Sequence, residues 1–245
     1  MTNTSQMMQN PQPAHAGSPA NRSVLPAAAP LLALQRAFDV VLSGLLLILA
    51  LPIFLLTILA ICLGDRGHVF YRQTRAGLNG KPFSILKFRS MSPNRISQLD
   101  KCEVGQDHPL VTPVGRWIRR TKIDELPQLL NVFLGHMSLV GPRPRPVEQL
   151  ADDGDFERRR MVRRPGMTGW AQINGGIDIS WPDRILLDVW YVDHWSLWLD
   201  LKILALTLPT VVSGPATSGH ALAEAAAHAL RSYPAAKSSQ TVCRA

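Results

Sequence analysis

Two adjacent carboxylates, Asp124 and Glu125, lie in a segment that is otherwise rich in cations. Arg143 and Arg145 follow the pair and alternate with prolines, and a basic run precedes it: Arg116, Arg119, Arg120 and Lys122. A carboxylate can attack phosphorus or hold a metal ion, and a guanidinium group binds phosphate oxygens in a bidentate manner. This combination predicts chemistry on a phosphate group.

A purely structural role for the pair is the alternative. Negative charge at the start of a helix complements the helix dipole, so Asp124 could be the N-cap of a helix that Gly135 ends. Thr121 could instead be the cap, with Asp124 completing a capping box. On the pair alone the structural role is favoured, because single short motifs are often false matches. The flanking segments reverse that balance.

The composition indicates anionic partners. The chain has 245 residues, and 26 Lys and Arg against 18 Asp and Glu give a net charge of +8. Such a balance suits nucleic acid, phosphorylated metabolites or anionic lipid headgroups. The cysteines are far apart and form no CxxC, which argues against a zinc site or a disulfide framework and fits a reducing compartment. No groove-reading motif accompanies the arginines, so no nucleic-acid partner is expected.

The uncharged segment Val40–Leu63 is long enough to span a bilayer. Pro52 lies at its centre, where it removes a backbone hydrogen bond and bends a helix. Basic residues flank both ends, which by the positive-inside rule places both ends in the cytoplasm. A re-entrant helix satisfies both flanks. A kinked spanning helix is equally open at this stage, since proline is tolerated in spanning helices.

A hairpin is predicted after this segment. Val69–Tyr71 and Lys81–Arg89 are typical of strands, and Gly77–Gly80 is typical of the tight turn between them. Lys87 and Arg89 would then point to the same face of the second strand.

The remaining chain is predicted to be mainly helical. We expect helix over 117–135, a proline-stiffened loop over 136–146, a turn over 165–170 leading to a short apolar strand, and one or two helices over 183–212. Residues 1–30 and the chain beyond Ser213 have the composition of loose tails.

Two residue clusters allow two interpretations each. The arginine run in Phe156–Arg164 is typical of a solvated helix face, but it could also contact lipid headgroups. The aromatic cluster within 183–212 suits a membrane interface, and an aromatic-rich core helix is the alternative. Its members are Trp190, Tyr191, Trp195 and Trp198.

Taken together and in order, these segments resemble the bacterial sugar transferases, the monotopic polyprenyl-phosphate phosphoglycosyl transferases. The resemblance runs from about Arg36 to Gly214. It rests on the proline-broken apolar segment and on four further motifs: VFYRQTRAGLNGKPFSILKFRSM, VGRWIRRTKIDELPQLLNVFLGHMSLVGPRPRP, RPGMTGWAQING and WYVDHWSLWLDLKIL. Any one of these is modest evidence, whereas the ordered set is specific.

The resemblance implies an α/β, mostly helical monotopic membrane protein with amphipathic interfacial helices. For the apolar segment, the resemblance favours a re-entrant helix, broken at Pro52, over a kinked spanning helix. The expected organisation is a disordered tail over 1–30, a re-entrant membrane helix over 31–64, a cytoplasmic catalytic domain over 65–213 and a flexible tail over 214–245.

The implied activity is transfer of a sugar 1-phosphate from a UDP-sugar to undecaprenyl phosphate, with release of UMP. This is the first membrane step of exopolysaccharide, O-antigen or glycan assembly, on the cytoplasmic face of the bacterial inner membrane. The implied cofactor is Mg²⁺. Asp124 matches the nucleophile that forms a covalent phosphosugar intermediate, and Glu125 matches the metal-holding residue.

The resemblance also assigns the surrounding residues. Lys87, Arg119 and Arg143 fall where the family has phosphate-binding or site-organising cations, and Arg89 belongs to the same motif as Lys87. Pro142 and Pro144 shape the loop that presents Arg143. This intact set argues against a membrane-anchored scaffold that has kept the fold without activity. The sequence identifies neither the sugar nor the oligomeric state, and a homodimer is left open.

Overall fold

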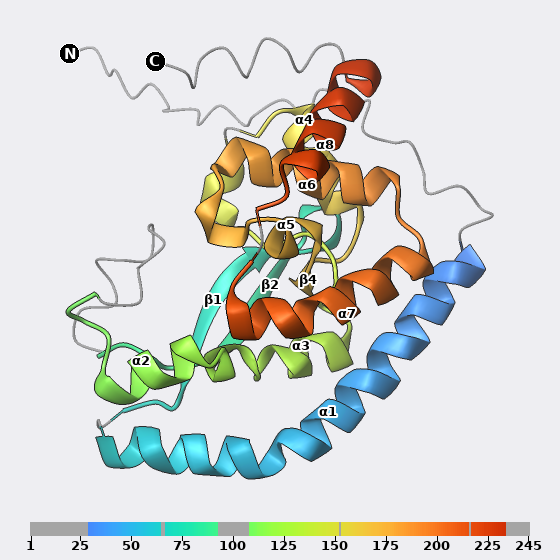
Figure 1. Cartoon of the computed structure of the whole chain (residues 1–245). Helices are drawn as coiled ribbons and strands as arrows, with labels where there is room; N and C mark the ends of the chain where they lie inside the picture. Colours follow the sequence, from blue (N-terminus) through green and yellow to red (C-terminus); the bar gives the residue numbers. More distant parts are fainter. Residues whose placement is uncertain (1–28, 65–66, 93–107, 152, 216, 234–245) are drawn as a thin grey trace, which may run out of the picture.

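The computed structural model describes residues 29–64, 67–92, 108–151, 153–215 and 217–233. Of the tail expected over 1–30, residues 1–28 lie outside this range, and so do the last residues from 234. The expected tail is wrong for Ala29 and Pro30, which begin the first helix. Within the described range, helices surround two small two-stranded sheets, and the long helix α1 (Ala29–Gly64) runs along one edge of the molecule (Figure 1). The fold is therefore α/β and mostly helical, as predicted.

Helix α1 continues through Pro52 and is bent. One part runs down the side of the molecule, and the other lies beneath α2 (Pro113–Arg120) and α3 (Gln128–Leu134) (Figure 1). In the described part of the chain it is the only helix long and apolar enough to cross a membrane. Side chains along its outer face, such as Ile48, Leu56 and Leu63, are exposed.

Both ends of α1 contact the same folded body. Near the N-terminal end, the guanidinium of Arg36 donates to the carbonyl oxygens of Val132 and Phe133 at 2.6 and 2.7 Å. Near the C-terminal end, Ile61 packs in a small core with Phe88 and Ile118. Arg36 is therefore bound to the C-terminal end of another helix rather than lying free on the flank of the apolar segment.

The predicted hairpin is confirmed. Strand β1 (Phe70–Ala76) pairs with β2 (Pro82–Phe88) in antiparallel register, and Lys87 lies opposite Tyr71. The turn between the strands holds Asn79 at a φ of 55°, in the left-handed region that asparagine tolerates.

The helix predicted over 117–135 is divided into two. Helix α2 (Pro113–Arg120) is capped by the Thr112 side chain, and α3 (Gln128–Leu134) ends at Gly135 with a φ of 90°. Between them lie a left-handed residue, Lys122, and a short 3₁₀ turn. This turn and α3 have no side-chain cap, so the capping roles considered for Asp124 and Thr121 are wrong.

A short parallel sheet follows. Strand β3 (Ser138–Val140) lies in the segment predicted as an extended loop, and it pairs with β4 (Gly166–Thr168). The predicted turn is thus itself a strand, and the segment after it is a helix, α5 (Trp170–Ile173). The backbones at Gly141 and Gly166 approach so closely that only glycine fits at position 166. A Cβ atom there would lie 2.1 Å from the backbone nitrogen of Gly141.

The C-terminal third is helical. After the short α4 (Asp155–Arg158), the chain forms α6 (Trp181–Asp193) and α7 (Leu197–Ser213), which confirms the prediction of one or two helices over 183–212. The flexible tail expected over 214–245 is wrong for residues 219–232, which form α8 (Gly219–Ser232). Alanine favours helix, and the alanines at 221, 225 and 229 recur every four residues and are buried in the main core.

Most of the aromatic cluster belongs to the core, as the alternative interpretation proposed. Tyr191 is buried and its hydroxyl donates to Asp200 at 2.7 Å. Trp190 stacks on Trp170, and the Trp195 indole N–H donates to Asp200 at 2.9 Å. Only the fourth member, Trp198, is largely exposed, at 76%.

The arginine run is not a solvated helix face. Arg160 is buried and paired with Asp188, Arg159 pairs with Asp193 at 2.9 Å, and Arg163 lies over the Trp195 ring at 3.6 Å. Arg158 alone of these is exposed. The partners of these arginines, Asp188, Asp193 and Trp195, come later in the sequence and cover them from solvent.

Candidate active site

The interruption between α2 and α3 turns Asp124 inward. Lys122 adopts a φ of 58°, which reverses the chain before the short turn Ile123–Glu125, and Pro127 follows. Asp124 is buried and Glu125 is half-buried. A continuous helix would have left this polar pair along its own surface, so the break creates the site.

Glu125 is held by two cations from different elements. Its Oε1 accepts from Lys87 Nζ of β2 at 2.6 Å and from Arg143 Nη2 of the following loop at 2.9 Å. The structure thus brings together Lys87, Arg143 and the carboxylate pair, as the resemblance implied. These three elements are distant in sequence and meet only through the fold.

The pKa values of the two carboxyl groups are driven apart. Burial and the adjacent Glu125 raise the pKa of Asp124 to about 6, against the opposing effects of Lys87, Arg119 and Lys122. Burial would also raise the pKa of Glu125, but Arg143 and Lys87 outweigh it and hold that pKa well below its usual range. One carboxylate is therefore firmly ionised and ion-paired, while its neighbour is a poorly solvated base. Such a divergence is common where two carboxylates have different chemical roles.

Arg119 lies beside this pair on α2. Its Nε donates to Ser90 Oγ at 2.9 Å, and its charge acts to lower the pKa of Asp124. Arg89 is buried at the end of the hairpin, where its backbone N–H donates to the Val69 carbonyl at 2.8 Å. A substrate contact for Arg89 stays a prediction. Arg145, the other arginine after the pair, forms an ion pair with Asp153 and lies over the Trp181 ring at 4.5 Å.

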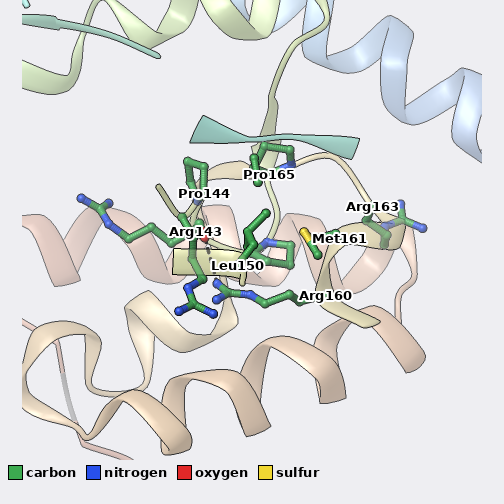
Figure 2. A pocket seen from close by; sticks show the side chains of 10 residues that line it. Arg143, Pro144, Leu150, Arg160, Met161, Arg163 and Pro165 are labelled. Atoms are coloured by element: carbon green, nitrogen blue, oxygen red, sulfur yellow. Dashed lines mark hydrogen bonds between the residues drawn. The ribbon is translucent and has the colours of Figure 1, made fainter. Parts of the chain in front are cut away.

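The loop that presents Arg143 is fixed on both sides by its prolines. Pro142 and Pro144 are buried, whereas the Arg143 side chain between them is partly exposed. In Figure 2 the Arg143 side chain extends away from Met161 and Arg163, which line a small pocket behind the loop. Arg160, which the sequence did not single out as a site residue, donates to the Arg143 carbonyl at 2.8 Å (Figure 2).

The acidic residues of the site can be compared with the ways in which proteins bind Mg²⁺. Among the residues that the structure describes, no three His, Cys, Asp or Glu side chains converge to form a complete metal site. Mg²⁺, however, is commonly bound through one or two carboxylates plus water and substrate phosphates. The carboxylate of Glu125, which lies between Lys87 and Arg143, is chemically compatible with a donor set of that kind.

The comparisons with known proteins identify the family of the chain. The family profile described as "Bacterial sugar transferase" matches residues 31–214. An uncharacterized sugar transferase, EpsL of Bacillus subtilis, is 47% identical over 193 residues, covering 78% of this chain and 94% of EpsL. The chain therefore belongs to the bacterial sugar transferase family. Helix α8 lies beyond the matched residues.

Two further relatives have more specific names. The undecaprenyl-phosphate glucose phosphotransferase of Komagataeibacter xylinus is 46% identical over 187 residues, covering 71% of this chain and 35% of that protein. The UDP-glucose:undecaprenyl-phosphate glucose-1-phosphate transferase of Escherichia coli is 42% identical over 185 residues, covering 71% of this chain and 39% of that protein. The chain thus spans well under half the length of these two relatives.

Proposed function

We propose that this protein is an undecaprenyl-phosphate sugar-1-phosphate transferase that takes its donor from a UDP-sugar and releases UMP. The observation that carries the proposal is the buried Asp124 beside a Glu125 that Lys87 and Arg143 hold ionised. The relatives named for undecaprenyl-phosphate sugar transfer support the same substrates. Relatives named as exopolysaccharide production proteins support a place in exopolysaccharide assembly.

The first step is a displacement at the β-phosphorus of the UDP-sugar. A carboxylate oxygen of Asp124 forms a bond to phosphorus, the bond to the bridging oxygen breaks, and UMP leaves with that electron pair. The attacking oxygen and the diphosphate are both anionic. Lys87, Arg119 and Arg143 reduce their repulsion and stabilise the charge that develops on the leaving phosphate.

The second step returns the enzyme to its starting state. A phosphate oxygen of undecaprenyl phosphate attacks the same phosphorus, the aspartyl oxygen leaves, and the product is a lipid-linked sugar diphosphate. Glu125 would hold Mg²⁺, which when bound supplies Lewis-acid neutralisation of the diphosphate. The poor solvation of Asp124 favours attack, because little water has to be removed from the nucleophile.

The membrane helix is proposed to be re-entrant. Arg36 near one end of α1 and Ile61 near the other both contact the catalytic body, and the helix bends between them. If that body lies on one side of the bilayer, both ends of α1 lie on that side. Donor UDP-sugars are cytoplasmic, so we place the body on the cytoplasmic face of the inner membrane.

The test is release of UMP from a panel of UDP-sugars by the purified full chain in detergent, with and without undecaprenyl phosphate. We expect sustained UMP release from at least one sugar only when the lipid is present. The panel should include UDP-glucose, UDP-galactose and UDP-N-acetylglucosamine, because the site does not identify the sugar. Binding of UDP-sugar without UMP release from any donor would instead support a scaffold that has lost activity.

A further inference from the structure

The Arg143 loop has few backbone donors of its own, because the prolines at 142, 144 and 146 lack an N–H group. Its carbonyl oxygens are instead bound from outside at four consecutive residues. Gly166 N–H donates to Pro142 at 3.0 Å and Ala76 N–H to Arg145 at 2.8 Å. The side chains of Arg75 and Arg160 donate to Pro144 and Arg143 at 3.1 and 2.8 Å. The loop is thus held externally throughout.

Arg160 is the only one of these side-chain donors that lies in the protein interior. It is 3% exposed and pairs with Asp188 of α6, which is 1% exposed. A single nitrogen, Nη2, donates both to Asp188 and to the carbonyl oxygen of Arg143. Asp188 therefore fixes the guanidinium, and the guanidinium fixes the backbone of the residue whose side chain contacts Glu125.

Stability alone does not account for such a pair. The cost of removing two charges from water commonly cancels their attraction, and well-packed apolar residues can replace a buried ion pair at little or no loss. Position, by contrast, matters greatly for catalysis, since a misplacement of about 1 Å can cost on the order of 100-fold in rate.

We propose that Arg160 and Asp188 are positioning residues for the transfer reaction, which hold the Arg143 guanidinium against Glu125 and the β-phosphate of the donor. The inference rests on the proposed function. Neither residue touches the reacting atoms; both act through the backbone of Arg143.

The chain contains a matched control. Arg159 and Asp193 form a second ion pair between the same two stretches of chain, at 2.9 Å. Asp193 accepts further bonds from His228 and Tyr233 at 2.9 and 2.7 Å, at the α8 side of the molecule. This pair therefore contributes to packing, but it makes no described contact with the Arg143 loop.

The experiment compares Arg160→Met/Asp188→Leu with Arg159→Met/Asp193→Leu in the full chain, measuring thermal midpoint and kcat/KM for UMP release. We expect both variants to fold, the first to lose activity on the order of 100-fold and the control to stay within about threefold of wild type. Equal losses in the two variants would overturn the proposal. A wild type without activity would refute the proposed function instead.

A double-mutant cycle separates positioning from stability. Arg143→Ala is introduced into the wild type and into the Arg160→Met/Asp188→Leu background. If the pair acts through Arg143, the Arg143→Ala loss must be at least tenfold smaller in that background than in the wild type. An unchanged loss would overturn the proposal. Arg160→Lys, which keeps the buried charge, provides the same cycle if the double variant does not fold.

Discussion

Lowering the pH from 7 to 5 should slow the first half-reaction about tenfold, because Asp124 must be ionised to attack phosphorus. Burial and the adjacent Glu125 raise the pKa of Asp124 to about 6. With that pKa, about nine-tenths of the groups are ionised at pH 7 and about one-tenth at pH 5.

Unfolding does not account for this fall. A carboxyl group whose pKa is raised in the folded state contributes stability that is fully present below its unfolded pKa and lost as the pH rises through about 6, so acidification favours the fold at Asp124. The contribution of Glu125 to folding stability depends on pH in the opposite direction. Burial acts to raise its pKa, but Arg143 and Lys87 keep it well below its usual range. Its stabilising contribution is present above the unfolded value of 4.5 and is lost only as the pH falls further.

The assay is single-turnover UMP release with enzyme in excess and no lipid acceptor. Leaving out the acceptor matters, because a phosphate monoester has its own pKa of about 6. Burial also raises the pKa of Asp188 to about 6, so the Arg160→Met/Asp188→Leu variant serves as a control that lacks this group. The fall in the rate of UMP release between pH 7 and pH 5 should persist in that variant. A rate that is flat or rises between pH 7 and pH 5 would refute the assignment of Asp124 as the ionised nucleophile.

Three further predictions concern metal, phosphate binding and topology. Glu125→Gln should lose most activity, and EDTA should silence the wild type until Mg²⁺ is restored; full activity in EDTA would show that the cations suffice. Arg143→Lys keeps the charge but not the planar fork, so it should cost on the order of 100-fold in kcat/KM, while Arg158→Ala on the exposed end of α4 should cost little; equal losses would mean that the site is misplaced. Cysteines introduced at positions 22 and 81, in a chain without its native cysteines, should both be protected from an impermeant reagent in intact cells, and labelling of position 22 alone would establish a spanning helix. Pro52→Ala should straighten α1 and give that spanning pattern as a positive control.

The parts of the fold that depend on local sequence were predictable. The hairpin follows from a glycine-rich turn between two strand-like runs, and Gly135 ends α3 because it accepts a positive φ. The left-handed conformation of Lys122 was not predictable, since lysine has no local preference for it. That single residue divides the predicted helix and buries Asp124.

Contacts between residues distant in sequence also could not be predicted from local patterns. Nothing near Arg160 in the sequence indicates that its partner is Asp188, so local patterns allow only a solvated helix face or a contact with lipid headgroups. Likewise, the alanines that line one side of α8 are buried because α8 packs against α6, and the sequence of α8 alone does not show this contact. The resemblance assigns Lys87, Asp124, Glu125 and Arg143 to one site. The structure brings Lys87 and Arg143 to Glu125, and no local sequence pattern contains those contacts.

The central claim is that Asp124 becomes covalently attached to the phosphosugar, and the most direct measurement is to trap that species. The full chain is incubated with a UDP-sugar labelled in its β-phosphate, with Mg²⁺ and without lipid acceptor, then quenched and digested for mass spectrometry. We predict label on the peptide that contains Asp124, loss of that label when undecaprenyl phosphate is added before the quench, and no label on a folded Asp124→Asn variant. Turnover of UDP-sugar by an Asp124→Asn variant at near wild-type rate, or a wild-type chain that releases UMP without ever carrying label at Asp124, would contradict the covalent mechanism.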